Sequence, residues 1–264
     1  GINFIKMELK KKFYSKNYSK SKIKFGFFTR VGGISKNNYF SLNCSLSSGD
    51  NKKLVKKNIN IALKKLHLEK SSLKTVKQIH SNKVLEITNN NLNKKIECDG
   101  MITQDINISL AILTADCCPI FIFDIDSKFI ACLHAGWRGV YKNIVKNAFK
   151  KINRIQPNNK KIISIIGPCL DKNNFEVDKI FKIKFLKKNP LYNSFFEDIA
   201  FKNKSLFNMR ALIKQQLIDE NIYNIEDIKE DTYSNIDLFF SHRRSTHLQN
   251  LPTGRMINII GFRK

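Results

Sequence analysis

The chain has 264 residues, of which 42% are hydrophobic and 26% are charged, as in an ordinary globular protein with a sizeable core. No apolar run approaches the roughly 18 residues that a membrane span needs, so we expect no membrane association. The net charge of +25 is due mainly to Lys spread along the whole chain, which favours a compositional bias over a nucleic-acid-binding surface.

The first third of the chain alternates between apolar runs and turns. A Phe-rich run at 24–29 predicts a strand, which ends in the turn Arg30-Val31-Gly32-Gly33. Asp50 is the predicted N-cap of a helix whose apolar residues keep helical spacing up to Leu66. Segments 75–80 and 83–88 are predicted to pair as strands around Ser81-Asn82, and a polar loop follows at 89–95.

The middle of the chain carries its most apolar runs. Residues 108–113, 119–123 and 129–133 are predicted to be central strands. A helix at 140–152 and a buried strand at 162–166 follow, and the strand ends at Gly167-Pro168-Cys169.

The last third is predicted to hold two helices, at 178–188 and 207–220, and two closing strands, at 237–241 and 256–262, on either side of the polar stretch 242–254. Strands and helices interleave irregularly, and no linker or repeat divides the chain. We therefore expect one α+β domain over 1–264, with residues 1–20 at its periphery. No GxGxxG or Walker A pattern supports a dinucleotide or P-loop site.

Cysteine usage and the first residues of the chain bear on its compartment. The six cysteines form no CxxC pair, and residues 1–6 show no apolar signal-peptide core. We expect a cytoplasmic protein without a disulfide framework.

Arginine is scarce in this Lys-rich chain, which makes its positions informative. Five of the eight arginines lie beside Gly, His or Ser turns: Arg30, Arg138, Arg243, Arg244 and Arg255. A guanidinium offers planar, bidentate binding of phosphate or carboxylate, which Lys does not. A structural ion pair explains any single one of them about equally well.

Three side chains suited to a metal ion lie where predicted strands end. His80 ends the segment 75–80, Cys117 begins the turn after 108–113, and His134 follows 129–133 within His134-Ala135-Gly136-Trp137-Arg138-Gly139. Two imidazoles and a thiolate suit Zn²⁺ and leave a fourth position open for water. The alternative is two hydrogen-bonded histidines and a buried thiol.

The same residues also fit a metal-free thiol hydrolase, with Cys117 as nucleophile and His134 as base. The two hypotheses compete for one sulfur. Cys118 should point the opposite way and pack. Asp116 and Asp99 either orient a ligand or bond nearby turns, and Ser241-His242-Arg243-Arg244 is either an anion site or a solvated loop.

Taken together, the motifs resemble the YfiH family, described as multicopper polyphenol oxidase or laccase-like proteins and as purine nucleoside phosphorylases. The matching segments occur in family order: Thr29–Ser35, Ser41-Leu42-Asn43, Gln78-Ile79-His80-Ser81, Thr114-Ala115-Asp116-Cys117-Cys118-Pro119, His134–Gly139, Gly167-Pro168-Cys169, Phe175-Glu176-Val177 and Thr253-Gly254-Arg255-Met256.

The resemblance implies a single layered αββα-type domain with mixed sheets. It also implies Zn²⁺, or Cu²⁺ in some reports, on His80, Cys117 and His134. The implied activities are phosphorolysis of adenosine, inosine, guanosine and methylthioadenosine, and deamination of adenosine. A role in peptidoglycan editing is attributed to relatives.

We expect a monomer that acts on purine nucleosides and phosphate. From motif position, Arg30, Arg138 and Arg243 are the predicted phosphate-binding residues. Asp99 and Glu176 are the predicted carboxylates for proton transfer, and Glu176 is also a candidate for substrate binding. Cys117, His134, Asp99 and Arg138 make up the predicted catalytic set.

Two departures from the family pattern concern the end of the chain. His242 stands where the family commonly has Tyr, so it either adds a titratable group to the site or replaces a packing residue. The connection 245–252 is longer than usual. The alternatives are a copper phenol oxidase, although the chain lacks the several His-x-His pairs of multinuclear copper sites, a metal-free Cys/His hydrolase and a nucleic-acid-binding protein.

Overall fold

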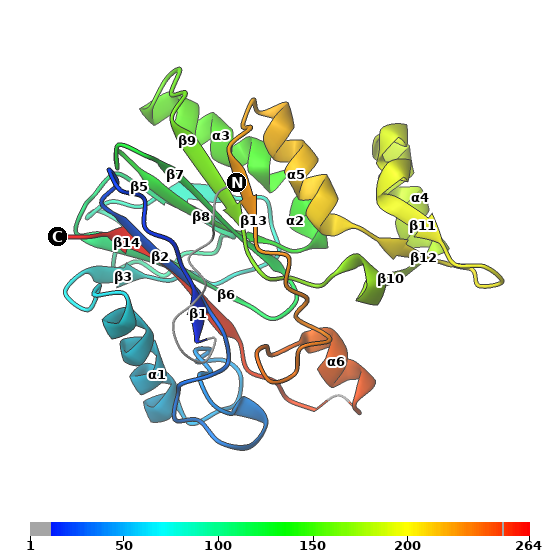
Figure 1. Cartoon of the computed structure of the whole chain (residues 1–264), viewed down its shortest axis with the longest axis horizontal. Coiled ribbons are helices and arrows are strands. Elements are labelled where there is room, and N and C mark those ends of the chain that lie inside the picture. Colours follow the sequence, from blue (N-terminus) through cyan, green and yellow to red (C-terminus); the bar gives the residue numbers. More distant parts are fainter. Residues whose placement is uncertain (1–11, 250) are drawn as a thin grey trace.

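The computed structural model describes residues 12–249 and 251–264. Two mixed sheets stack face to face (Figure 1). The five-stranded sheet has the order β1 (Phe13–Tyr14), β2 (Ile23–Phe28), β14 (Met256–Phe262), β6 (Ile108–Thr114), β3 (Ser72–Lys74). The six-stranded sheet has the order β13 (Ile225–Asp227), β9 (Ile162–Ile166), β7 (Cys118–Asp124), β8 (Ile130–Ala135), β5 (Gly100–Thr103), β4 (Val84–Glu86).

Helices cover the outer face of each sheet, and strand side chains alternate between the layers. Between the sheets, Phe27 of β2 stacks on Phe121 of β7, with ring centroids 4.3 Å apart. The outer face of the five-stranded sheet packs against α1 (Lys52–Lys65). The outer face of the six-stranded sheet packs against α2 (Trp137–Tyr141), α3 (Ile144–Ile155) and α5 (Met209–Asp219). The α+β, αββα-type sandwich with mixed sheets is thereby confirmed.

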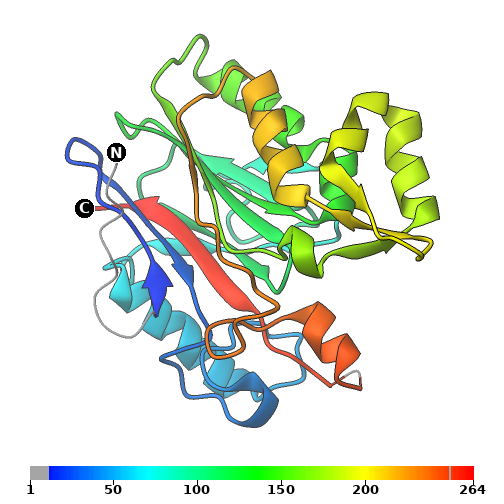
Figure 2. The ribbon, with the colours of Figure 1, turned by 45° about the vertical axis from the view of Figure 1, so that its right-hand side comes forward.

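A smaller unit projects from one side of the sandwich (Figure 2). It holds the three-stranded sheet β10 (Glu176–Asp178), β12 (Lys204–Phe207), β11 (Phe196–Asp198), the helix α4 (Lys179–Lys188) and the 3-10 helices η2 (Lys172–Asn174) and η3 (Pro190–Phe195). Its centre is aromatic: Phe185 packs on Phe207 with ring centroids 5.1 Å apart. The sequence predicts α4 but not this sheet, because its strands are too short to show a period of two.

Predicted strands at 24–29, 108–113, 119–123, 129–133, 162–166 and 256–262 match β2, β6, β7, β8, β9 and β14. The predicted helix at 140–152 is instead two helices. Asn143 adopts a left-handed φ of 56° and accepts a hydrogen bond from the Lys146 backbone, so it begins α3 as a cap. Asn51, rather than Asp50, caps α1, because Asp50 accepts hydrogen bonds from Ser35 and Asn43.

Two predictions about strands are wrong. Segments 75–80 and 83–88 do not pair with each other: β3 ends at Lys74, before the first segment begins, and β4, within the second, belongs to the other sheet. Residues 237–241 form turns rather than a strand, and the polar stretch after them contains the helix α6 (His242–His247). Near the start, η1 (Asn37–Tyr39) lies within the loop after β2.

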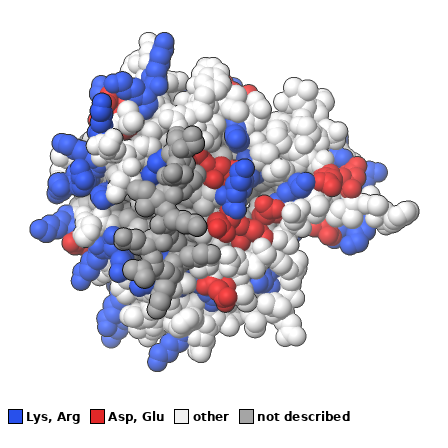
Figure 3. Space-filling model, viewed as in Figure 1, with Lys and Arg blue, Asp and Glu red and all other residues white. Residues whose placement is uncertain are grey.

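Of the segment 1–20 that was predicted to lie at the periphery, residues 1–11 lie outside the described residues. Tyr18 packs edge-on against Phe123 of β7 and donates a hydrogen bond to Glu226 of β13, which ties this segment to the six-stranded sheet. Basic side chains are scattered over the face shown in Figure 3, and do not form one patch. None of the described helices has the length and apolarity to cross a membrane.

The contact between the sheets should dominate stability. We expect Phe121→Ala to lower the free energy of unfolding by about 3–5 kcal/mol, because it leaves a cavity between the layers. Phe201→Ala, at a fully exposed ring, should change it by no more than about 0.5 kcal/mol. Chemical denaturation measures both, and equal effects would contradict this assignment of the core.

Candidate functional site

Three separate segments bring His80, Cys117 and His134 together where the two sheets meet. The chain leaves the five-stranded sheet at the end of β6 and enters the other sheet at β7, and Cys117 lies on that crossover. His134 lies on β8, opposite Pro119 of β7. His80 lies on the connection between β3 and β4. One ligand atom from each of the three side chains lies within 4.8 Å of the other two.

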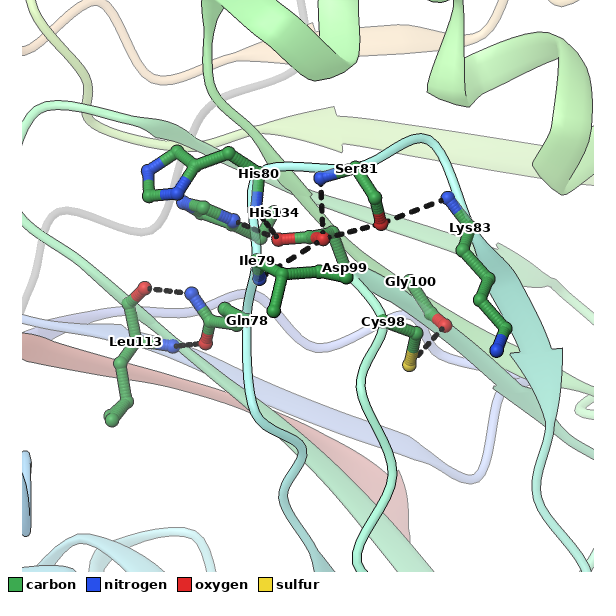
Figure 4. Close-up of polar contacts among 10 residues, drawn as sticks. All are labelled: Gln78, Ile79, His80, Ser81, Lys83, Cys98, Asp99, Gly100, Leu113 and His134. Carbon is green, nitrogen blue, oxygen red and sulfur yellow. Dashed lines mark hydrogen bonds and ion pairs between the residues drawn. The ribbon is translucent and has the colours of Figure 1, made fainter.

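Asp99 holds two of these side chains in place (Figure 4). Its buried carboxylate lies 2.7 Å from Nδ1 of His134. It also accepts hydrogen bonds from the backbone N–H groups of Ile79, His80 and Ser81 and from the Ser81 hydroxyl. One carboxylate therefore fixes both the His134 ring and the loop that carries His80.

The same contacts explain why segment 75–80 is not a strand as predicted. The N–H groups of Ile79, His80 and Ser81 bond to a side chain instead of a neighbouring strand, and His80 has a φ of 58°. A buried carboxylate has thus replaced the strand ladder as the partner of this backbone. Gln78 fixes the other side of the loop through reciprocal hydrogen bonds of 2.7 Å with the Leu113 backbone.

Gly136 leaves the space that the three side chains occupy. A Cβ at this position would lie 2.9 Å from Cys117 Sγ and 3.2 Å from His80 Cδ2. The backbone φ of −79° at Gly136 suits any residue, so conformation does not require a glycine here. The close approach of the Cys117 and His80 side chains does.

The electrostatics of the site favour a charged thiolate. Burial raises the pKa of the Cys117 thiol, but the neighbouring His134 and His80 outweigh it and lower that pKa to about 6. Burial lowers the pKa of His134, whereas Cys117 and Asp99 raise it to about 9. Burial raises the pKa of Asp99, and hydrogen bonds from His134 and Ser81 lower it to about 2. The remaining cysteines with resolved shifts, such as Cys44 and Cys132, have pKa values raised by burial.

The residues fit a metal ion of the zinc type. An ionised thiolate and two imidazoles are the ligand types that Zn²⁺ prefers. Because His134 Nδ1 bonds to Asp99, its Nε2 is the nitrogen left for a ligand bond, the arrangement usual for metal-binding histidines.

A cavity of about 340 Å³ opens beside the three side chains. Residues from six parts of the chain line it, among them Ser45, Ser47, Lys77, Gln78, His242 and Arg255. Its size lies within the usual range for small-molecule sites. His242 is one of the residues that line the cavity.

Comparison with known proteins identifies the family. Residues 24–263 match the family model described as multi-copper polyphenol oxidoreductase laccase. The chain belongs to this family, the YfiH family. It is 30% identical to a protein of Rickettsia conorii named purine nucleoside phosphorylase, over 80% of this chain and 90% of that one. A protein of the same name from Rickettsia prowazekii is 34% identical over 65% of this chain and 70% of its own length.

Solved structures of similar proteins have the same fold. A Neisseria meningitidis protein superposes with a TM-score of 0.85 at 27% identity, covering 96% of this chain and 100% of that one. The YfiH protein of Bacillus licheniformis gives a TM-score of 0.82 at 26% identity, covering 92% and 93%. The αββα sandwich is thus the fold of the YfiH family.

Three arginines predicted to bind phosphate lie outside the set of residues lining the cavity. Arg30 bonds to the Phe40 and Ile236 carbonyls and stacks on Phe240. Arg138 is exposed and stacks on Trp137. Arg243 bonds to the Glu176 carbonyl and lies over Phe175. Arg255, one of the five arginines that lie beside turns in the sequence but not one of the three predicted to bind phosphate, lines the cavity instead.

The other candidate residues of this YfiH protein serve the structure around the site. Glu176 pairs with Lys204 at 2.9 Å and does not line the cavity. Asp116 accepts hydrogen bonds from the Thr232 hydroxyl and the Arg243 backbone. Cys118 is buried in the core, as predicted. Trp137 packs on Phe181 of α4 with ring centroids 5.0 Å apart.

The lowered pKa of Cys117 gives a pH prediction for protein treated with a chelator. Iodoacetamide reacts with the thiolate, so alkylation of Cys117 should be half-maximal near pH 6, fall at lower pH and reach a plateau above it. His134→Gln should move the midpoint upward, because it removes a cation. Mass spectrometry of the labelled peptide measures both, and a wild-type midpoint at the ordinary thiol value of about 8.5 would contradict the described electrostatics.

Gly136→Ala tests the packing of the site. The added methyl group should push Cys117 and His80 apart, and reduce bound metal at least tenfold while the protein stays folded. Metal analysis of purified protein and circular dichroism measure the two effects. Cys117→Ala serves as the reference for complete loss, and normal metal content in Gly136→Ala would contradict the described contact.

Proposed function

We propose that the chain is a zinc-dependent purine nucleoside phosphorylase that acts on adenosine, inosine, guanosine and methylthioadenosine and also deaminates adenosine. The observation that carries the proposal is the convergence of His80, Cys117 and His134 within 4.8 Å beside a cavity. The names of the Rickettsia relatives support the reaction class.

In phosphorolysis, a phosphate oxygen forms a bond to the anomeric carbon of the sugar, and the bond from that carbon to the purine nitrogen breaks. The electron pair of the broken bond stays on the purine, which takes up a proton. The products are the free base and the sugar 1-phosphate. The cavity must therefore hold an anion against the sugar while positive charge develops there.

In deamination, water adds to the purine carbon that bears the amine, and ammonia leaves. Zn²⁺ on His80, Cys117 and His134 would supply Lewis-acid chemistry that makes water nucleophilic near neutral pH. Asp99 is unsuited to proton transfer, because its oxygens accept several hydrogen bonds and its pKa is lowered to about 2. Its role is to orient His134 and His80. His242 lines the cavity and is the imidazole we assign to proton transfer.

A second candidate is a thiol hydrolase. Asp99 bonds to His134, and His134 lowers the pKa of Cys117, so the three residues also form a nucleophile, a base and an orienting acid. The two functions make opposite demands on Cys117. A hydrolase needs a reactive sulfur, whereas a metal site occupies it.

Metal content and phosphate dependence test the proposed function together. Wild type should carry about one Zn²⁺ per chain and release adenine from adenosine only when phosphate is present. His80→Ala, Cys117→Ala and His134→Ala should lose the metal and at least a hundredfold in activity, while Arg154→Gln, on the exposed face of α3, should match wild type.

Other outcomes point elsewhere. Adenine release without phosphate would overturn phosphorolysis. Bound copper with oxidation of a phenol would favour an oxidase. Rapid labelling of Cys117 in zinc-loaded protein would favour the hydrolase.

A further inference from the structure

Arg255 and Lys77 are the two side chains with a permanent positive charge that line the cavity beside His80, Cys117 and His134. The charge of Lys77 is already balanced, because its Nζ lies 2.6 Å from Glu97. Arg255 has no ion pair within residues 12–249 and 251–264. Its one side-chain hydrogen bond there goes from a guanidinium nitrogen to the Gly254 carbonyl, at 3.0 Å.

The nearby carboxylate of Asp116 is occupied by other donors. One oxygen accepts from the Thr232 hydroxyl at 2.7 Å and the other from the Arg243 backbone N–H at 2.6 Å. The half-buried guanidinium lines the cavity, and its one side-chain hydrogen bond, to the Gly254 carbonyl, leaves its other N–H donors without an acceptor among the described residues. Desolvating a cation in this way is costly unless a ligand supplies the negative charge.

Asn43 fixes the position of Arg255. Its buried side-chain oxygen accepts hydrogen bonds from the backbone N–H groups of Arg255 at 3.0 Å and Ser45 at 3.1 Å. Its amide nitrogen donates to Ser48 and Asp50. Gly254 allows this approach, because a Cβ there would lie 2.9 Å from the same oxygen.

Two hydroxyls add donors to the same wall of the cavity. Ser45 Oγ and Ser47 Oγ lie 3.3 Å apart, and both residues line the cavity. When one hydroxyl donates to the other, the second keeps its proton available for a ligand. Asn43 thus organises a guanidinium and a serine pair on one side of the site.

We propose that Arg255, with Ser45 and Ser47, forms the subsite for a tetrahedral oxyanion, that its ligand is the inorganic phosphate consumed in phosphorolysis, and that Asn43 is its positioning residue. This proposal rests on the proposed function for the identity of the anion. It moves phosphate binding from Arg30, Arg138 and Arg243 to a residue within the cavity.

The test measures phosphate binding and phosphate kinetics separately in zinc-loaded protein. Equilibrium dialysis with radiolabelled inorganic phosphate gives the dissociation constant, and steady-state rates give KM for phosphate and for inosine. Arg255→Gln should weaken phosphate binding and raise KM for phosphate about ten- to a hundredfold, with a much smaller change in KM for inosine. Arg255→Lys should fall between Gln and wild type, because it restores charge without the bidentate fork.

Asn43 and a matched control complete the series. Asn43→Ala should raise KM for phosphate less than Arg255→Gln, and the double variant should add little to Arg255→Gln, because Asn43 acts through Arg255. Arg154→Gln removes an exposed arginine of α3 and should leave every constant unchanged. Circular dichroism establishes that each variant is folded.

The outcomes separate the two proposals. Phosphate binding that depends on Arg255 without any phosphorolysis would sustain the subsite and overturn the proposed function. Phosphorolysis in which KM for phosphate ignores Arg255, or responds instead to Arg138→Gln or Arg243→Gln, would overturn the subsite and leave the proposed function standing.

Discussion

The candidate site depends on the buried carboxylate of Asp99. A buried charge is stable only where several donors satisfy it, and here His134, Ser81 and the backbone of the His80 loop do so. These bonds join β8 of the six-stranded sheet to a loop that arrives from the other sheet. Loss of the charge would release the ring and the loop together. Asp99 is therefore needed both for local stability and for the geometry of the site.

The arrangement of the sheets explains why His80, Cys117 and His134 converge at the crossover from β6 to β7. The crossover from β6 to β7 joins the two layers, and its short turn carries Cys117 out of both hydrogen-bonded ladders. The rigid central strands hold Cys117 and His134 in register, while Gly136 keeps the corner free of side-chain atoms. A cysteine whose pKa is lowered thus lies on a rigid frame, as precise binding requires.

The long apolar strands and the convergence of His80, Cys117 and His134 could be predicted from the sequence, because hydrophobic runs and rare residue types are local signals. The placement of His80 was predicted for the wrong reason. Its segment is not a strand, since its N–H groups bond to Asp99, which is 19 residues away in sequence. Arg255 could not be singled out from the five arginines beside turns for a similar reason. Its suitability as an anion ligand depends on the ion pair of Lys77 with Glu97 and on the two hydrogen bonds that Asp116 accepts. None of these contacts can be read from a sequence pattern.

Charge balance connects the metal site with the proposed anion subsite. The Cys117 thiolate and the Asp99 carboxylate supply two negative charges. A divalent ion on the trio would offset both charges, since imidazoles that bind a metal are neutral. Lys77 is neutralised by Glu97. The guanidinium of Arg255 has no salt-bridge partner among the described residues, although Cys117 and Asp116 interact with it electrostatically, and it would attract an anion without competing for the metal. Because this positive charge belongs to a side chain held by Asn43, the anion would be directed to one wall of the cavity, and the space beside His134 and Cys117 would stay available for a nucleoside.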